Sequence, residues 1–277
     1  MSTTDQFRQS IAAAGLAPHG DLDLAGDGKL QRYRIDGDKA GSRNGWAVMY
    51  SHPVMAGAFG SWKTGESHTW CEQRTSKPAT PAEQAEMHRQ MFAMRAARAA
   101  EQANVQATAR ERAAKLWALA HPATNAHPYL QRKQIGAYGI RQLNGALVIA
   151  ARDVRGELHT LQFIGADGSK RFLTGGRIVG CYFAIGRPVD SLLLCEGLAT
   201  ASTLHQATGR AVAVAFNCGN LVAVAKALRS KFPALRMIVC ADNDFATQGN
   251  PGVTHAQAAA RTVGGFLAVP KFPEVSA

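Results

Sequence analysis

The spacing of apolar and polar positions changes along the chain, and each change predicts a different kind of structure. Near the N-terminus, stretches such as GWAVMY alternate apolar and polar residues between Gly, Asp and Asn, which is typical of antiparallel strands. After Pro81, an Ala-, Arg- and Gln-rich run to about Ala120 contains no Gly or further Pro. That run predicts one long helix or a broken pair. Short apolar stretches between the turns DVRG and ADGSK then predict a second set of strands.

The last third of the chain alternates apolar runs with segments of helical spacing. The strand candidates are LLLCEG, AVAVAFN, LRMIVCAD and GFLAVPKF, and the helix candidates between them are LATASTLHQAT, NLVAVAKALRSKF and VTHAQAAARTV. This alternation predicts a mainly parallel sheet with helices covering its faces.

These patterns divide the chain into four parts. We expect a small mixed α/β or β-rich domain at 1–78, a long helical linker at 79–122, a basic β-rich subdomain at 123–190 and an α/β domain at 191–277. The expected fold class is therefore an α+β N-terminal unit and a basic antiparallel β unit, followed by an α/β domain with a mainly parallel sheet.

The charge of the chain favours a polyanionic partner. There are 31 Lys and Arg against 20 Asp and Glu, a formal net charge of +11. Residues 81–190 hold 15 of the basic and 8 of the acidic residues, so the excess lies mostly in the middle of the chain. Two asparagines after the second strand of the last domain are expected to expose amides that contact nucleotide. The candidates for nucleic-acid or nucleotide binding are Arg152, Arg155, Lys170, Arg171, Arg177, Asn217 and Asn220.

Aromatic and basic residues are interleaved in the N-terminal domain, and two interpretations stay open. They could stack on and neutralise single-stranded nucleic acid, or the aromatics could form the core of a small domain, which is the commoner use of such residues. The residues are Tyr33, Trp46, Trp62 and Trp70 with Arg32, Arg34, Arg43 and Lys63.

Cysteine spacing and the absence of long apolar runs exclude several classes of protein. The five cysteines form no CxxC pair, which argues against a zinc ribbon and a disulfide scaffold and predicts mostly buried, reduced thiols. The polar start MSTTDQFRQS lacks the apolar core of a signal peptide, and no apolar run approaches the roughly 18–20 residues that span a bilayer. We therefore expect a cytoplasmic protein with no membrane partner.

Three carboxylates follow apolar strands of the last domain. Glu196 follows Leu192 to Cys195, and Asp242 and Asp244 follow Met237 to Ala241. Because ligand sites of open α/β sheets lie at the carboxyl ends of the strands, we expect the three to converge and hold a cation, with Mg²⁺ suited to oxygen ligands. Taken singly, a strand-end Glu is more often solvated or capping, and DND is a common turn signal.

The residues EGLATA and ADND, 46 residues apart, resemble the Toprim domain shared by bacterial primases, topoisomerases and some nucleases. More narrowly, EGLATA is similar to the EGYATA motif of primases from conjugative plasmids and some phages, with Leu198 in place of the tyrosine. Upstream, HPYLQRKQI, ALVIAARDVRGELHTLQFI and KRFLTGG resemble the basic subdomain that precedes Toprim in replicative primases. The resemblance covers roughly residues 125–270.

The resemblance implies a DNA primase that makes short RNA primers on single-stranded DNA from ribonucleoside triphosphates. It implies that Glu196, Asp242 and Asp244 hold Mg²⁺ or Mn²⁺. Replicative primases also have an Arg and a Lys-Tyr pair at the catalytic cleft. In this chain, Phe163 stands where the resemblance places the Arg. The residues near the Lys-Tyr position are Lys170, Arg171 and Phe172.

Other interpretations stay open at this stage. Lys170 and Arg171 would neutralise triphosphate or template phosphates, or they are simply charges on a strand surface. The chain contains no GxxxxGK[ST] loop, so unwinding would need a separate helicase or replication initiator. A Toprim nuclease and a non-catalytic nucleic-acid-binding accessory protein remain the alternative functions.

Overall fold

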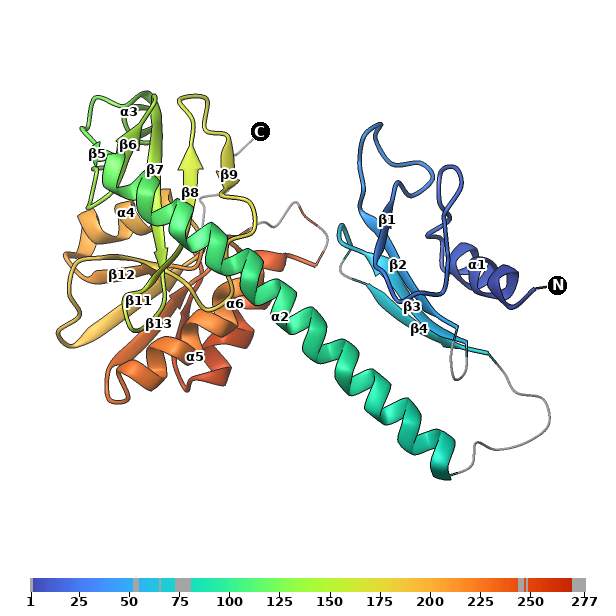
Figure 1. The fold of residues 1–277 in the computed structure, drawn as a ribbon. Coiled ribbons are helices and arrows are strands. Elements are labelled where there is room, and N and C mark those ends of the chain that lie inside the picture. Colours follow the sequence, from blue (N-terminus) through green and yellow to red (C-terminus); the bar gives the residue numbers. More distant parts are fainter. Residues whose placement is uncertain are drawn as a thin grey trace, which may run out of the picture. The chain divides into compact units, whose positions relative to one another are not determined.

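The computed structural model describes residues 2–51, 55–64, 66–72, 81–243, 247 and 249–270 (Figure 1). The chain divides into two compact units, Met1–Arg98 and Ala99–Ala277. The boundary lies inside helix α2 (Pro81–Leu119), which is the long helix that the sequence predicts. No helix among the described residues is both long and apolar enough to cross a membrane. The finer division into four domains stays a prediction.

The N-terminal unit is a four-stranded antiparallel sheet with one helix on it. Helix α1 (Thr3–Ala13) begins with a capping box between Ser2 and Asp5. It packs Phe7 and Ile11 onto the sheet. The strands pair in the order of the chain: β1 (Gln31–Tyr33), β2 (Gly45–Tyr50), β3 (Ala56–Ser61) and β4 (Ser67–Cys71).

The aromatic residues of this unit divide between the two faces of the sheet. Tyr33 is buried in the core and donates its hydroxyl to the carbonyl of Leu16 at 3.0 Å. Trp70 packs against Phe7, with ring centroids 5.1 Å apart. The interpretation as core residues is therefore confirmed for Tyr33 and Trp70, whereas the other two tryptophans lie elsewhere.

The second unit contains a five-stranded antiparallel sheet followed by a second sheet. The antiparallel strands also pair in chain order: β5 (His121–Pro122), β6 (Arg141–Leu143), β7 (Ala146–Arg152), β8 (Leu158–Ile164) and β9 (Lys170–Phe172). Helix α3 (Pro128–Lys133) lies between β5 and β6 and is capped by the buried His127. One face of this sheet packs Val148, Ala150 and Leu161 against α2.

The C-terminal sheet has the strand order β10-β12-β11-β13-β14. All its pairs are parallel except the one between β10 and β12. Its strands are β10 (Phe183–Ile185), β11 (Ser191–Cys195), β12 (Ala211–Val214), β13 (Arg236–Cys240) and β14 (Phe266–Ala268). The predicted fold class is confirmed.

Helices cover both faces of the C-terminal sheet (Figure 1). Helix α4 (Leu198–Thr208) packs on one face, and α5 (Leu221–Lys231) and α6 (Pro251–Thr262) pack on the other. The face under α4 also meets the antiparallel sheet, because Leu147 and Ile149 share a buried core with Leu193 and Val214. The two sheets of this unit are therefore joined through one core.

Strand β10 differs from what the sequence pattern suggests. The apolar run that ends at Ile185 continues the earlier antiparallel strands, yet Ala184 of β10 pairs with Ala213 of β12. Phe183 and Ile185 alternate with an exposed alanine and enter the shared core. The local pattern identifies a strand, but the choice of partner depends on contacts distant in sequence.

Asn220 corrects one of the expectations from the sequence. It is the last residue of the short 3₁₀ turn after β12 (Cys218–Asn220), is 4% exposed, and accepts a 2.8 Å hydrogen bond from the backbone N–H of Gly180. Its amide N–H groups donate to the carbonyls of Ile178, Cys181 and Ala215 at 3.1, 3.0 and 2.9 Å. The expected exposure of the Asn220 amide was wrong, because these bonds use it to fasten loop 178–181 to the end of β12. Its contact with nucleotide stays a prediction.

We expect Asn220→Ala to lower the free energy of unfolding by about 3 kcal/mol or more, since each buried group left unpaired costs about 1–3 kcal/mol. The matched control is Asn217→Ala. Asn217 is exposed and caps only the 3₁₀ turn, so its loss should cost about 1 kcal/mol. Urea unfolding followed by circular dichroism measures both, and equal losses would contradict the structural role of Asn220.

Candidate metal site and basic strand

Two of the predicted carboxylates emerge from neighbouring strand ends. Glu196 directly follows β11, and Asp242 lies two residues beyond the end of β13. The strands are parallel, and Leu194 is opposite Val239, so Glu196 is level with the residue before Asp242. Both side chains are partly exposed. The structure therefore brings Glu196 and Asp242 to the same edge of the sheet, whereas Asp244 lies outside the described residues.

Thr200 adds a third oxygen at this edge that the sequence argument missed. Its hydroxyl donates to Oδ1 of Asp242 at 3.2 Å from the first turn of α4. The signal was present in EGLATA, because a helix that starts at Leu198 places residue 200 beside the strand end. Thr200 thus fixes the orientation of the Asp242 carboxylate.

Two buried thiols lie beneath the carboxylates. Burial raises the pKa of Cys195 well above its ordinary value, and the nearby Cys240, Asp242 and Glu196 raise it further. Burial, and then the charge of Asp242, raise the pKa of Cys240 to about 11. Both cysteines are free of disulfides. The floor of the site is therefore uncharged at neutral pH.

Asn243 turns away from Asp242. Its amide donates to the carbonyl of Pro270 at 3.2 Å, and its oxygen accepts from the amide of Asn250 at 2.8 Å. Asn250 also caps α6 by accepting from the N–H of Val253. Asp242 is therefore held by Thr200, and Asn243 by Pro270 and by Asn250 at the start of α6.

Strand β9 carries the basic pair Lys170 and Arg171, and the structure separates their side chains. Phe172 makes an edge-to-face contact with Phe216, just beyond β12, with centroids 5.5 Å apart. Lys170 lies on the same face of β9 as Phe172, because side chains two residues apart share a face. Arg171 lies on the other face, 5.5 Å from the ring of Phe163. Only Lys170 therefore shares the face that contacts the carboxyl end of β12.

Arg152 and Arg155 occupy different environments at the start of the β7–β8 turn. The Arg152 guanidinium lies 5.7 Å from the ring of Trp117 and donates to the carbonyl of Gly156 at 2.9 Å. Burial, and then the neighbouring Arg141, lower the pKa of Arg152. Arg155 is exposed. Of these two predicted contacts, Arg155 is the accessible one.

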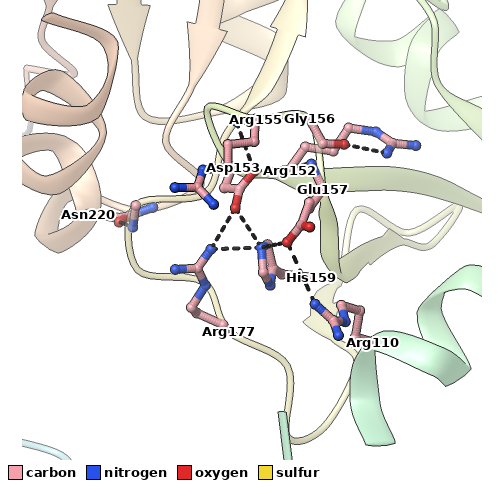
Figure 2. A network of polar contacts seen from close by, with 10 residues as sticks. Arg110, Arg152, Asp153, Arg155, Gly156, Glu157, His159, Arg177 and Asn220 are labelled. Atoms are coloured by element: carbon pink, nitrogen blue, oxygen red, sulfur yellow. Dashed lines mark hydrogen bonds and ion pairs between the residues drawn. The ribbon is translucent and has the colours of Figure 1, made fainter. Parts of the chain in front are cut away.

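Arg177 belongs to a polar network around the same turn (Figure 2). Its Nη2 lies 3.2 Å from Oδ2 of Asp153 and 2.7 Å from Nε2 of His159, and His159 Nε2 lies 2.9 Å from the same Asp153 oxygen. Burial alone would raise the pKa of Asp153, but hydrogen bonds from His159 and from the backbone N–H groups of Glu157 and Arg155 lower it. Arg177 is thus engaged within the fold.

The same network has the residue types of a metal site. The ligand atoms of Asp153, Glu157 and His159 all lie within 4.8 Å of one another. Arg177, however, places its guanidinium against two of the three, in the position that a cation would take. Glu157 also pairs with Arg110 of α2 at 3.6 Å. The network therefore joins the turn, α2 and the loop after β9 by internal charge pairing.

Comparisons with solved structures find primases at low identity. One is the DnaG primase catalytic domain bound to single-stranded DNA, at 14% identity with a TM-score of 0.43, covering 63% of this chain and 74% of that one. Another is the primase fragment of the bacteriophage T7 primase-helicase, at 15% identity with a TM-score of 0.37, covering 55% and 65%. Both TM-scores are below 0.5, so these likenesses assign no residue of this chain.

The sequence comparisons are more specific. A DNA primase TraC from Escherichia coli is 35% identical over 97% of this chain and 26% of its own length. A second Escherichia coli DNA primase TraC is 34% identical over 98% of this chain and 20% of its own length. The chain therefore spans about a quarter of the first relative and a fifth of the second. Residues 191–273 match the Toprim domain family and form a Toprim domain. They contain the sheet edge that carries Glu196 and Asp242, which we call the carboxylate edge.

Proposed function

We propose that the chain acts as a DNA primase, synthesising short RNA primers on single-stranded DNA by metal-dependent nucleotidyl transfer. The observation that supports this most directly is the placement of Glu196 and Asp242 at adjacent parallel strand ends of the Toprim domain, with Thr200 bonded to Asp242. The 35% identity to a primase over 97% of the chain supports the same activity.

The donor set at this edge fits a hard divalent cation. Glu196 and Asp242 offer carboxylate oxygens and Thr200 a hydroxyl, the ligand types preferred by Mg²⁺ and Mn²⁺. Asp244 is the proposed third carboxylate. When bound, one or two such ions would activate the attacking 3′-hydroxyl and stabilise the leaving pyrophosphate. The hydrogen bond from Thr200 holds Asp242 in one orientation, as partners of metal ligands commonly do.

Polar and basic residues on or near the antiparallel sheet would bind the phosphates of the nucleotide and the template. Lys170 stands on the β9 face that meets Phe216, so we assign it to the incoming triphosphate or the template. Arg155 and Asn217, both exposed, are the proposed further contacts with nucleic acid or nucleotide. Arg152, Arg171 and Arg177 are engaged with Trp117, Phe163 and Asp153, so we assign them weaker roles. A separate helicase or replication initiator of a plasmid or phage is the proposed protein partner.

The metal site is tested by incubating the chain with single-stranded DNA, labelled ribonucleotides and Mg²⁺ or Mn²⁺. Glu196→Gln and Asp242→Asn should abolish oligoribonucleotide synthesis because each removes a ligand charge. Thr200→Val should reduce it by roughly 10- to 100-fold, the usual effect of losing a ligand's hydrogen-bond partner. Chelation of divalent ions should stop synthesis, and added Mg²⁺ should restore it.

The matched control for charge is Glu111→Gln, which removes an exposed carboxylate on α2 and should leave synthesis unchanged. Synthesis that persists in both Glu196→Gln and Asp242→Asn would refute the assigned site. Cleavage of the DNA without synthesis would identify a Toprim nuclease instead. Salt-sensitive binding with neither reaction would identify a non-catalytic accessory protein.

Lys170 and Arg171 form a natural matched pair, because they are adjacent, exposed and equally charged. We expect Lys170→Ala to lower kcat/KM for ribonucleotides by about 10- to 100-fold, the range for losing one hydrogen bond to a charged group. Arg171→Ala should have less than about a threefold effect, since its guanidinium lies on the opposite face over Phe163. Steady-state priming rates measure both, and a larger loss with Arg171→Ala would reverse the assignment.

A further inference from the structure

The sheet of the N-terminal unit has a second face that α1 does not cover. Ala47, Met49 and Phe59 point into the core under α1. Strand register places the alternate residues on the other face and aligns them in one row across all four strands. That row consists of Arg32, Trp46, Gly60 and Ser67.

Two indole rings lie together on this face. Trp46 and Trp62 have ring centroids 5.8 Å apart and planes at 39°. Trp62 is 61% exposed, and its backbone N–H donates to the carbonyl of Asn44 at 2.9 Å. A Cβ on Gly60 would lie 2.8 Å from Cζ2 of Trp46, so glycine makes room for the indole there. Trp62 is thus supported by the sheet and open to a ligand, and Trp46 beside it is partly exposed.

Two arginines border the indoles without neutralising partners. The Arg32 guanidinium donates to the carbonyl of Arg43 at 2.9 and 3.2 Å, and that of Arg43 donates to the carbonyl of Arg32 at 3.1 Å. Within the described ranges neither side chain forms an ion pair, and both are exposed. Lys63 differs, because it is 2.7 Å from the buried Asp38. The two guanidinium charges therefore remain available to an anion.

This combination matches the chemistry of a single nucleic-acid strand. Unpaired bases present flat π-faces that stack on aromatic side chains irrespective of sequence, while the phosphates take the arginines. A duplex buries its base faces and offers only its charge. An acidic peptide would use the arginines but would leave the two indoles without matching planar groups.

We propose that the face of β1–β4 opposite α1 binds single-stranded nucleic acid, with bases stacked on Trp62 and Trp46 and phosphates on Arg32 and Arg43. If the chain is a primase, this strand is its DNA template, and only that identification rests on the proposed function. The binding itself is independent of the carboxylate site.

The test measures binding of the full chain to a labelled oligothymidylate of roughly 16 nucleotides, by fluorescence anisotropy in the presence of a chelator so that no divalent ion contributes. Trp62→Ala should weaken binding by roughly 5- to 150-fold, the range for losing one stacked base. Trp62→Phe should retain most of the affinity, because it keeps an aromatic face. Leu30→Ala, which removes another exposed apolar side chain of the same unit, is the control and should bind like the parent.

The arginines are tested by salt dependence. Arg32→Ala and Arg43→Ala should each reduce the slope of log affinity against log salt by about 0.7, the value for one single-strand phosphate contact. Unlabelled duplex of the same length should compete less well than single strand. Circular dichroism establishes that every variant is folded.

The outcomes separate this inference from the proposed function. Glu196→Gln should bind the oligonucleotide like the parent even though it cannot prime. Undiminished binding by Trp62→Ala, or equal competition by duplex, would overturn the inference while leaving priming intact. A change in self-association by Trp62→Ala, with no change in oligonucleotide affinity, would also overturn it and assign the face to a second copy of the chain. Weakened binding by Trp62→Ala in a chain that does not prime would support the inference alone.

Discussion

The C-terminal unit depends on strand β11, which is hydrogen-bonded in parallel to β12 on one side and β13 on the other. All five of its residues are buried. Parallel neighbours bring their carboxyl ends to one edge, so a polar residue directly after β11 lies beside one that follows β13. Helices must also cover both faces, since a parallel strand has no solvated side. The carboxylate edge and the positions of α4, α5 and α6 are therefore consequences of one pairing arrangement.

Three sets of contacts hold the antiparallel sheet to that edge. A shared core joins Leu147 and Ile149 to Leu193, Asn220 ties loop 178–181 to the end of β12, and Phe172 contacts Phe216. All three contacts are buried, since Phe216 belongs to the same core at 8% exposure and Asn220 is 4% exposed. Together they give β9 a defined position beside the Toprim edge, which a basic residue needs if it is to meet a phosphate held there.

Much of this organisation could be predicted from local pattern, and the remainder could not for a physical reason. The alternation of apolar runs predicted β11 to β14 with α4 to α6 between them, and the position of Glu196 after such a run placed it at the sheet edge. The pairing of β10 with β12, the choice of Asp242 as the partner of the Thr200 hydroxyl and the burial of Asn220 depend on residues far apart in sequence. The role of Arg177 was equally unpredictable from local sequence. Its guanidinium pairs with Asp153, 24 residues earlier in the chain, instead of being free on the surface.

In the N-terminal sheet, strand register determines which aromatic residues enter the core and which lie on the opposite face. Four aromatics interleaved with basic residues are compatible with either a core or a binding face, although a core is the commoner use of such residues. Strand pairing assigns each residue to one face of the sheet. Tyr33 of β1 lies opposite Gly45 of β2 and points into the core, whereas Arg32 lies opposite Trp46 and both point to the other face. Trp70 joins Phe7 in the core. Trp46 packs over Gly60 beside Trp62, and Trp62 is 61% exposed although Val48, on the same face of β2, is buried. An exposed aromatic ring beside guanidinium groups without ion-pair partners is a candidate contact surface, as exposed apolar patches on proteins commonly are.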